Sequence, residues 1–301
     1  MKNTDPSPIP QKALPVSVYR EIHKQASTGI SSATLASTVA DLLTIAFFWC
    51  MRSCEYSLVT GERRTKLLCF RNIRLYDKFN KPISLDSPNL ELAHSVSITF
   101  EFQKKDVRDD TISHQRSGDK KDGGVMCPVK ACISLILRAR KLPISFPQLL
   151  DIPINTVQLS TSTYKIPSEV FLDTIRRTVS DMGKDTLGFG PEEVGTHSNR
   201  SAGAMSMFLS GTPVYTIMLI GRWSSDAFMR YIRKQVLAAS HGISAKMLTF
   251  EDFFTIPDFV HNAADGDLRN RNRNNLATTT SFNGTHASMR LGAHPAFHLE
   301  H

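Results

Sequence analysis

The chain has 301 residues and a formal net charge of +8, from 36 lysines and arginines against 28 aspartates and glutamates. Hydrophobic residues make up 41% of it and charged residues 21%, a balance that excludes a wholly disordered chain. Five cysteines, an odd number without a CxxC pair, exclude a disulfide framework and favour a reducing, intracellular compartment.

No segment has the pattern of a secretory signal or a membrane span. The first thirty residues contain several prolines and no apolar core. The longest apolar stretch, residues 42–51, is about half the roughly 20 residues that a membrane helix needs. We therefore expect a soluble protein without membrane contact, and the positive charge favours a polyanionic partner.

The first part of the chain predicts a loose segment followed by one long helix. Residues 1–20 are rich in proline and are expected to be flexible. Residues 33–57 are expected to form a single helix, because apolar side chains recur there at steps of three and four. The segment 61–81 that follows is basic.

The hydrophobic period then changes to two. Val96, Ile98, Phe100 and Phe102 alternate with polar residues, which is typical of a half-buried strand. A return strand is expected near residues 111–114 and a third strand within 69–76, so a small antiparallel sheet is inserted between helices. His94 and His114 are expected on the surface of this sheet, and residues 120–124 in a hairpin or connecting loop.

Helices resume in the second half of the chain. Pro128 favours a helix start before residues 129–140, and Gly183 ends a helix at 168–182. Thr196 is the expected N-cap of a helix that ends before Gly211. The last expected helices are at 213–221 and around Tyr231. Residues 259–301 are polar and predict a disordered tail, which leaves one domain at 21–258.

Three short sequences carry residues that could act together on a phosphodiester. They are Arg52-Ser53-Cys54-Glu55, Gly195-Thr196-His197-Ser198-Asn199-Arg200, and Gly221-Arg222-Trp223, which Tyr231 follows eight residues after Trp223. Two arginines on different helices can hold the non-bridging oxygens of one phosphate. A nearby tyrosine can be a nucleophile, and a histidine can take or return its proton. Taken singly, each of these residues is a weak signal and more often has an ordinary structural role.

The order of these residues resembles the catalytic domain of tyrosine recombinases, the phage-integrase superfamily, from about residue 30 to about residue 240. The box at 219–233 is the most specific part. Its Gly-x-Trp form is similar to Cre-like members and to recombinases of eukaryotic mobile elements such as cryptons and DIRS-type retrotransposons. The resemblance implies an α+β, mainly α-helical fold: the tyrosine-recombinase catalytic domain with its small antiparallel β-sheet.

The resemblance also implies a role for each matched residue. Tyr231 corresponds to the nucleophile, and Arg52 and Arg200 to the arginines that stabilise charge in the transition state at phosphorus. His197 corresponds to the residue that assists proton movement. Glu55 matches the acidic residue that supports the first arginine.

Further assignments concern the hairpin lysine and the residue before the nucleophile's helix. Lys104 resembles the lysine that protonates the leaving 5′ oxygen, and Lys105 is the alternative because a hairpin register shifts easily by one residue. Trp223 stands where many members have a second histidine, and its indole N–H can donate to a phosphate oxygen. The residues expected to contact DNA are Lys105, Arg222, Arg230 and Arg233.

The implied activity is site-specific recombination or integration of double-stranded DNA through a 3′-phosphotyrosyl intermediate. It needs no metal, cofactor or ATP. The resemblance further implies a homotetramer on two DNA sites, a mobile-element origin and, in a eukaryote, a nuclear location.

Two alternative functions stay open, together with one alternative site. Only about 30 residues precede the catalytic region, where family members carry a longer DNA-clamping domain, so a catalytically inactive, domesticated DNA-binding protein is one alternative. A type IB topoisomerase, which shares the chemistry, is the other. Cys50 and Cys54 have helical spacing for zinc, but their apolar surroundings favour core packing.

Overall fold

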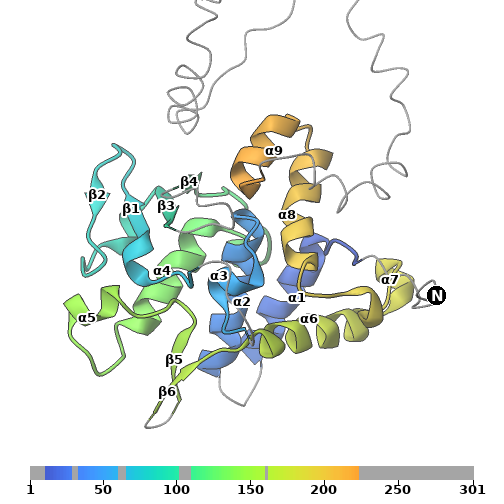
Figure 1. Ribbon diagram of the computed structural model, residues 1–301, viewed down its shortest axis with the longest axis horizontal. Coiled ribbons are helices and arrows are strands. Elements are labelled where there is room, and N and C mark those ends of the chain that lie inside the picture. The colour runs from blue at the N-terminus through green and yellow to red at the C-terminus, as the bar shows by residue number, and fades with distance from the viewer. Residues whose placement is uncertain (1–10, 29–32, 60–65, 102–109, 160–161, 224–301) are drawn as a thin grey trace, which may run out of the picture. The chain divides into compact units, whose positions relative to one another are not determined.

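The computed structural model describes residues 11–28, 33–59, 66–101, 110–159 and 162–223 (Figure 1). All of them belong to the first of the two compact units into which the chain divides. The described part is mostly helical with small antiparallel sheets, which confirms the predicted α+β, mainly α-helical class. None of the described helices is long and apolar enough to pass through a bilayer.

The first two helices form the base of the core. Helix α1, Val16–Thr28, buries Val18, Tyr19 and Ile22, which lie on one face at helical spacing, against α2 and α6. Helix α2, Ala33–Phe48, is apolar on nearly all sides and lies inside the core. The expected flexible segment 1–20 is therefore wrong for residues 11–20, because the apolar face of α1 needs α2 as a partner; Leu14 is also buried.

The long helix expected at 33–57 is broken after Phe48. Cys50 takes a left-handed conformation with φ of 46°, and the short helix α3, Ser53–Tyr56, follows. The Met51 N–H donates to the Ala46 carbonyl at 2.9 Å and the Cys50 N–H to the Phe47 carbonyl at 3.2 Å, the bonds of a Schellman motif. Glycine usually takes this conformation, and another residue costs about 1–2 kcal/mol there. Because the position is occupied by Cys50, no glycine in the sequence marks the break.

The predicted antiparallel sheet is confirmed. Its strands are β1 Ile73–Tyr76, β2 Pro82–Ile83, β3 Ser95–Phe100 and β4 Asp110–Gln115, in the order β2-β1-β3-β4. Ile98 of β3 pairs with Ile112 of β4, and the Ser97 and Ser113 hydroxyls are hydrogen bonded at 2.7 Å. His94 is exposed as expected, whereas His114 is only partly exposed, because its ring packs edge-on against Trp49 at 4.6 Å.

The remaining elements follow in chain order. They are α4 Pro128–Ala139, α5 Phe146–Leu150, β5 Thr156–Leu159, β6 Ser162–Lys165, α6 Ser168–Met182, α7 Lys184–Leu187, α8 Ser198–Leu209 and α9 Val214–Gly221, with short 3₁₀ turns at Phe70–Asn72, Leu90–Leu92, Lys121–Gly124 and Pro191–Glu193. Four of the helices match the predicted ones, except that His197 rather than Thr196 is the N-cap of α8. The β5-β6 hairpin and α5 were not predicted.

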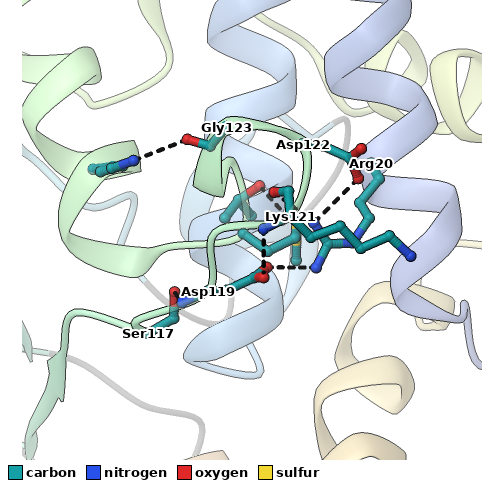
Figure 2. A network of polar contacts seen from close by, with 9 residues as sticks. Arg20, Ser117, Asp119, Lys121, Asp122 and Gly123 are labelled. Atoms are coloured by element: carbon teal, nitrogen blue, oxygen red, sulfur yellow. Dashed lines mark hydrogen bonds and ion pairs between the residues drawn. The ribbon is translucent and has the colours of Figure 1, made fainter.

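The loop before α4 is tied to α1 by one arginine, as Figure 2 shows. The Arg20 guanidinium forms ion pairs with Asp119 and Asp122 and donates to the Lys121 carbonyl at 3.1 Å. The Lys121 N–H donates in turn to the Asp119 carboxylate at 3.0 Å. Residues 120–124 are thus a connecting loop, as expected, with its acidic groups turned to α1.

Helix α8 meets the end of α2 at a glycine. A Cβ at Gly203 would lie 2.3 Å from the Phe47 carbonyl oxygen and 2.7 Å from the Cys50 Sγ, so only glycine allows this approach. The contact places α8 beside the Schellman turn that ends α2.

Candidate active site

Three distant parts of the chain meet at residues 49–52. They are the turn from α2 into α3, the first turn of α8 and the end of α9, and Figure 1 shows α8 and α9 as consecutive helices of the same region. The turn carries Arg52, the N-cap and first turn of α8 carry His197 and Arg200, and the end of α9 is followed by Trp223. The three short sequences singled out above are therefore neighbours in space.

Arg52 is held by the carboxylate three residues after it. Its Nη1 donates to Glu55 Oε1 at 2.9 Å, and its backbone N–H donates to Glu55 Oε2 at 2.8 Å. The Arg52 side chain is 24% exposed and that of Glu55 is 1% exposed. The pair thus presents a fixed guanidinium from a buried anchor, with Arg52 the exposed partner.

Arg222 is the second partner of the same carboxylate. Its Nη2 donates to Glu55 Oε2 at 2.8 Å, and its side chain is only 1% exposed. The expected DNA contact of Arg222 is therefore wrong, since this side chain points into the core. The physical reason is that a fully buried carboxylate next to one partly exposed arginine needs further neutralisation.

Glu55 remains ionised in this setting. Burial acts to raise its pKa, but the positive charges of Arg222, Arg52 and Arg200 outweigh burial and lower the pKa below its ordinary value. The site is consequently organised around one buried negative charge that three guanidiniums share.

Arg200 joins the ends of two helices. Its Nη1 donates to the Cys50 carbonyl beyond α2, and its Nη2 to the Gly221 carbonyl that ends α9. Carbonyls at helix C-termini lack partners within their helix, so the guanidinium satisfies both. Arg200 is 2% exposed, and burial, then the charges of Arg222 and Arg52, lowers its pKa, yet an arginine remains a cation at neutral pH.

The sequence analysis expected Arg52 and Arg200 to hold the non-bridging oxygens of one phosphate together, but the two side chains differ in exposure. Of the two, only Arg52 reaches the surface to a sizeable extent. Arg200 contributes its positive charge from a buried position, with one N–H of each Nη directed at a backbone carbonyl.

His197 lies at the N-terminus of α8, where its backbone N–H donates to Gln11 Oε1 at 2.9 Å. Desolvation of its ring, followed by the positive charges of Arg200 and Arg52, lowers the pKa of His197. The imidazole is therefore neutral at pH 7 and able to accept a proton.

Gln11 is a site residue that the sequence did not reveal, because it lies in a segment expected to be flexible. A Cβ at Gly195 would lie 2.2 Å from the Gln11 side chain, so this side chain rests on the glycine. The Lys12 N–H donates to the Glu193 carbonyl at 2.9 Å and continues the contact. Residues 11–12 thus hold the loop that leads into His197.

Trp223 lies across the end of α9 and against Arg200. The guanidinium carbon of Arg200 is 4.3 Å from the centre of the Trp223 ring. The backbone N–H of Trp223 donates to the Met218 carbonyl at 2.8 Å, and the backbone N–H of Arg222 donates to the Leu219 carbonyl at 3.1 Å. These are the bonds of a second Schellman motif. Arg222 takes the left-handed conformation here, with φ of 54°.

The remaining predicted residues lie outside the described ranges. They are Lys104, Lys105, Arg230, Tyr231 and Arg233. Strand β3 nevertheless brings the chain to the site, because the ring of Phe100, its last residue, lies 3.5 Å from the Arg222 guanidinium carbon.

The Cys50 thiol does not add a charge to the polar site, although the Cys50 carbonyl accepts a hydrogen bond from Arg200. Cys50 is buried, and burial raises the pKa of its thiol to about 11, so it stays protonated. Among the residues that the structure describes, no group of three or more His, Cys, Asp or Glu side chains could hold a metal ion.

Comparisons with known proteins give structural neighbours alone. No protein-family model matches the chain, and no curated protein matches it. Two similar solved structures are the XerH site-specific recombinase bound to palindromic difH substrate, a post-cleavage complex (TM-score 0.45, 14% identity), and XerH bound to difH substrate, a pre-cleavage complex (TM-score 0.44, 13% identity). The matches cover 79% of this chain and 54% and 56% of the XerH chains, so it spans about half their length.

Proposed function

We propose that this chain is a DNA strand-transfer enzyme of the tyrosine-recombinase type, a site-specific recombinase or integrase. The observation that carries the proposal is the meeting of Arg52, His197, Arg200 and Trp223 from three separate segments around the buried carboxylate of Glu55. Such a cluster joins anion-binding cations to a neutral base, the combination that phosphodiester cleavage by a protein nucleophile needs.

Arg52 is the residue that binds the scissile phosphate in this proposal. Its Nη1 is used by Glu55, and a guanidinium has further N–H groups that can bind the non-bridging oxygens of a scissile phosphate. Since the Glu55 anchor is buried, the guanidinium needs little reorganisation when the phosphate arrives.

The proposed reaction is balanced without an outside reagent. The Tyr231 oxygen forms a bond to phosphorus, the bond from phosphorus to the 5′ oxygen breaks, and a 3′-phosphotyrosine remains. The phenol proton passes to neutral His197, and Lys104 protonates the leaving 5′ oxygen. A second 5′-hydroxyl reverses the step on another strand, which is strand exchange.

Arg200 and Trp223 act beside Arg52. The positive charge of Arg200 favours the added negative charge of the transition state, and direct contact with a phosphate oxygen requires it to exchange one of its carbonyl bonds. The Trp223 indole N–H is a further donor for the same oxygens.

The proposal extends to the partner and the setting. The substrate is double-stranded DNA, bound by a homotetramer on two sites, and no cofactor enters the reaction. The enzyme would serve a mobile element of the Cre-like, crypton or DIRS-like type, inside the cell and in the nucleus of a eukaryotic host.

Nicked duplexes that tile the DNA flanking the gene test this function. After cleavage such duplexes lose a short strand, so a covalent adduct with the full chain accumulates and is seen on a denaturing gel. We expect an adduct with wild type and with Tyr215→Phe, a control at an exposed tyrosine of α9, and none with Tyr231→Phe.

The other outcomes separate the alternatives. DNA binding without any adduct, unchanged in Tyr231→Phe, would support an inactive DNA-binding protein instead. Relaxation of a supercoiled plasmid without site preference would support a topoisomerase.

A further inference from the structure

One buried side chain, that of Arg222, links several parts of the candidate site. It contacts the carboxylate that anchors Arg52, the turn that leads into Arg52 and the strand that ends at Phe100. It also precedes Trp223 directly in sequence. The inference below rests on the proposed function and gives Arg222 a part in it.

The carboxylate of Glu55 is divided between two arginines. Oε1 accepts from Arg52 Nη1 at 2.9 Å, while Oε2 accepts from Arg222 Nη2 at 2.8 Å and from the Arg52 backbone N–H at 2.8 Å. Arg222 therefore fixes the plane of the carboxylate, and this plane sets the direction in which the Arg52 guanidinium points.

The same guanidinium fixes the turn that precedes Arg52. Arg222 Nη1 donates to the Trp49 carbonyl at 2.9 Å. The face of the guanidinium lies on the ring of Phe100, at 3.5 Å from the ring centre. A lysine could supply the charge, but it has one nitrogen in place of the two separate Nη donors and no planar group to lie flat on the ring.

The backbone explains why this side chain points inward. The left-handed conformation at residue 222 ends α9 and reverses the direction of the chain, so that Arg222 enters the core while Trp223 turns back onto Arg200. The arrangement has a cost: the Arg222 Nε is buried and has no hydrogen-bond partner among the described residues, so one donor is left unsatisfied.

We propose that Arg222 is a positioning residue of the cleavage reaction, which holds the Glu55 carboxylate and the Trp49 turn so that the Arg52 guanidinium faces the scissile phosphate. It does not touch the substrate, since its side chain is 1% exposed.

A pH profile distinguishes this role from a purely structural one. The charged or titratable groups that face Glu55 are Arg222, Arg52 and Arg200, with Cys50 and Tyr56 nearby. Arg222 is the strongest of the three cations that lower the pKa of Glu55. Without it the carboxyl takes up a proton at higher pH, releases Arg52, and cleavage falls on the acid side.

The experiment compares full-length Arg222→Met and Arg222→Lys with Arg138→Met, a matched control. Arg138 also pairs with a buried carboxylate, that of Asp41, but lies between α2 and α4, outside the site. The readouts are the single-turnover rate of adduct formation on the nicked duplex that wild type cleaves, the dissociation constant for that duplex, and the melting temperature.

We expect Arg222→Met to cut the cleavage rate by about 100-fold, with DNA affinity within about threefold of wild type, and to show a new acid limb. Arg222→Lys should restore the pH profile and part of the rate. Arg138→Met should lower the melting temperature while the rate stays within about threefold. A cleavage rate in Arg222→Met equal to that of the Arg138 control, or a profile without the acid limb, would overturn the inference.

A second measurement keeps the inference separate from the proposed function. If wild type forms no adduct with any duplex, the proposed function is refuted. The side-chain ¹⁵N NMR signals of Arg52 then test whether Arg222 positions Arg52. Slowly exchanging Arg52 Nη signals in wild type and Arg138→Met that are lost in Arg222→Met support the positioning role. Unchanged Arg52 signals in Arg222→Met refute it, whether or not wild type cleaves.

Discussion

The Arg200 guanidinium stacks on the ring of Trp223, 4.3 Å from its centre, while both of its Nη atoms bind carbonyls at helix ends. The tryptophan therefore covers the cation that joins α2, α8 and α9. Because Gly221 lies directly beneath the same ring, the glycine, the tryptophan and the arginine are one packing unit.

Substitution Gly221→Ala should disrupt this unit. The new Cβ would lie 1.6 Å from Trp223 Cζ3, so the ring must leave its place on Arg200. We expect a loss of about 1–3 kcal/mol in unfolding free energy and a cleavage rate lower by about 100-fold. Chemical denaturation and the adduct assay measure the two effects.

Gly190→Ala is the matched control for that prediction. Its Cβ would also meet an atom at 2.3 Å, but this atom belongs to the flexible end of the Glu192 side chain. The control should change stability by less than about 0.5 kcal/mol. Equal effects at positions 190 and 221 would contradict the proposed packing unit.

The pH dependence of cleavage should follow the lowered pKa of His197. A free imidazole titrates near pH 6.5, whereas desolvation and the charges of Arg200 and Arg52 lower the pKa here. The base is thus already neutral above pH 6.5, and the single-turnover rate should stay constant from about pH 8 to about pH 6.5 and fall only below. His197→Gln should lose about 100-fold in rate, and the exposed His94→Gln none. A rate that already falls above pH 6.5 would argue against His197 as the base.

Acid should destabilise the fold through His114. Burial lowers the pKa of this ring to about 4, so between pH 6.5 and 4 the unfolded chain binds a proton that the folded chain does not. The stability contributed by the neutral ring is present above pH 6.5 and is lost as pH falls, by about 2 kcal/mol or more. Urea denaturation from pH 7 to pH 4 measures this slope, and His114→Phe, which keeps a ring against Trp49, should reduce it. An unchanged slope in the variant would show that other groups cause the acid loss.

Removal of the Gln11 side chain should loosen the start of α8. Gln11→Ala deletes the acceptor of the His197 N–H and should cost about 0.5–1 kcal/mol. The cleavage rate should fall more than that of Lys12→Ala, whose side chain forms a 4.0 Å ion pair with Glu193. If the two variants cleave DNA equally well, Gln11 has no part in placing His197.

The sequence predicted the elements with a clear period and missed those that tertiary contacts decide. The apolar spacing and the flanking Pro128 and Gly183 placed α4 and α6 correctly. The break at Cys50 was missed because no glycine or proline marks it, and the left-handed conformation there depends on contacts with α8. Helix α1 was missed because the prolines before it indicated a flexible segment, although Tyr19 lies on the buried face of the helix.

The candidate site was predictable as a set of residues but not as a geometry. Spacing alone placed Arg52 with Glu55, and His197 near Arg200. It assigned Arg222 to the surface, since a basic residue next to other site residues indicates contact with an anion. The reversal of the chain at residue 222 and the need of Glu55 for a second cation become visible only in three dimensions.

Helices α2 and α9 both stop beside the site, and each ends with carbonyl oxygens turned toward it. Two helix dipoles therefore direct their negative ends at one place, an arrangement that would repel a polyanion. The guanidiniums of Arg200 and Arg222 cover these oxygens and reverse the sign of the local potential. Neutral residues of the same size at both positions would leave the negative ends of the two helices uncovered.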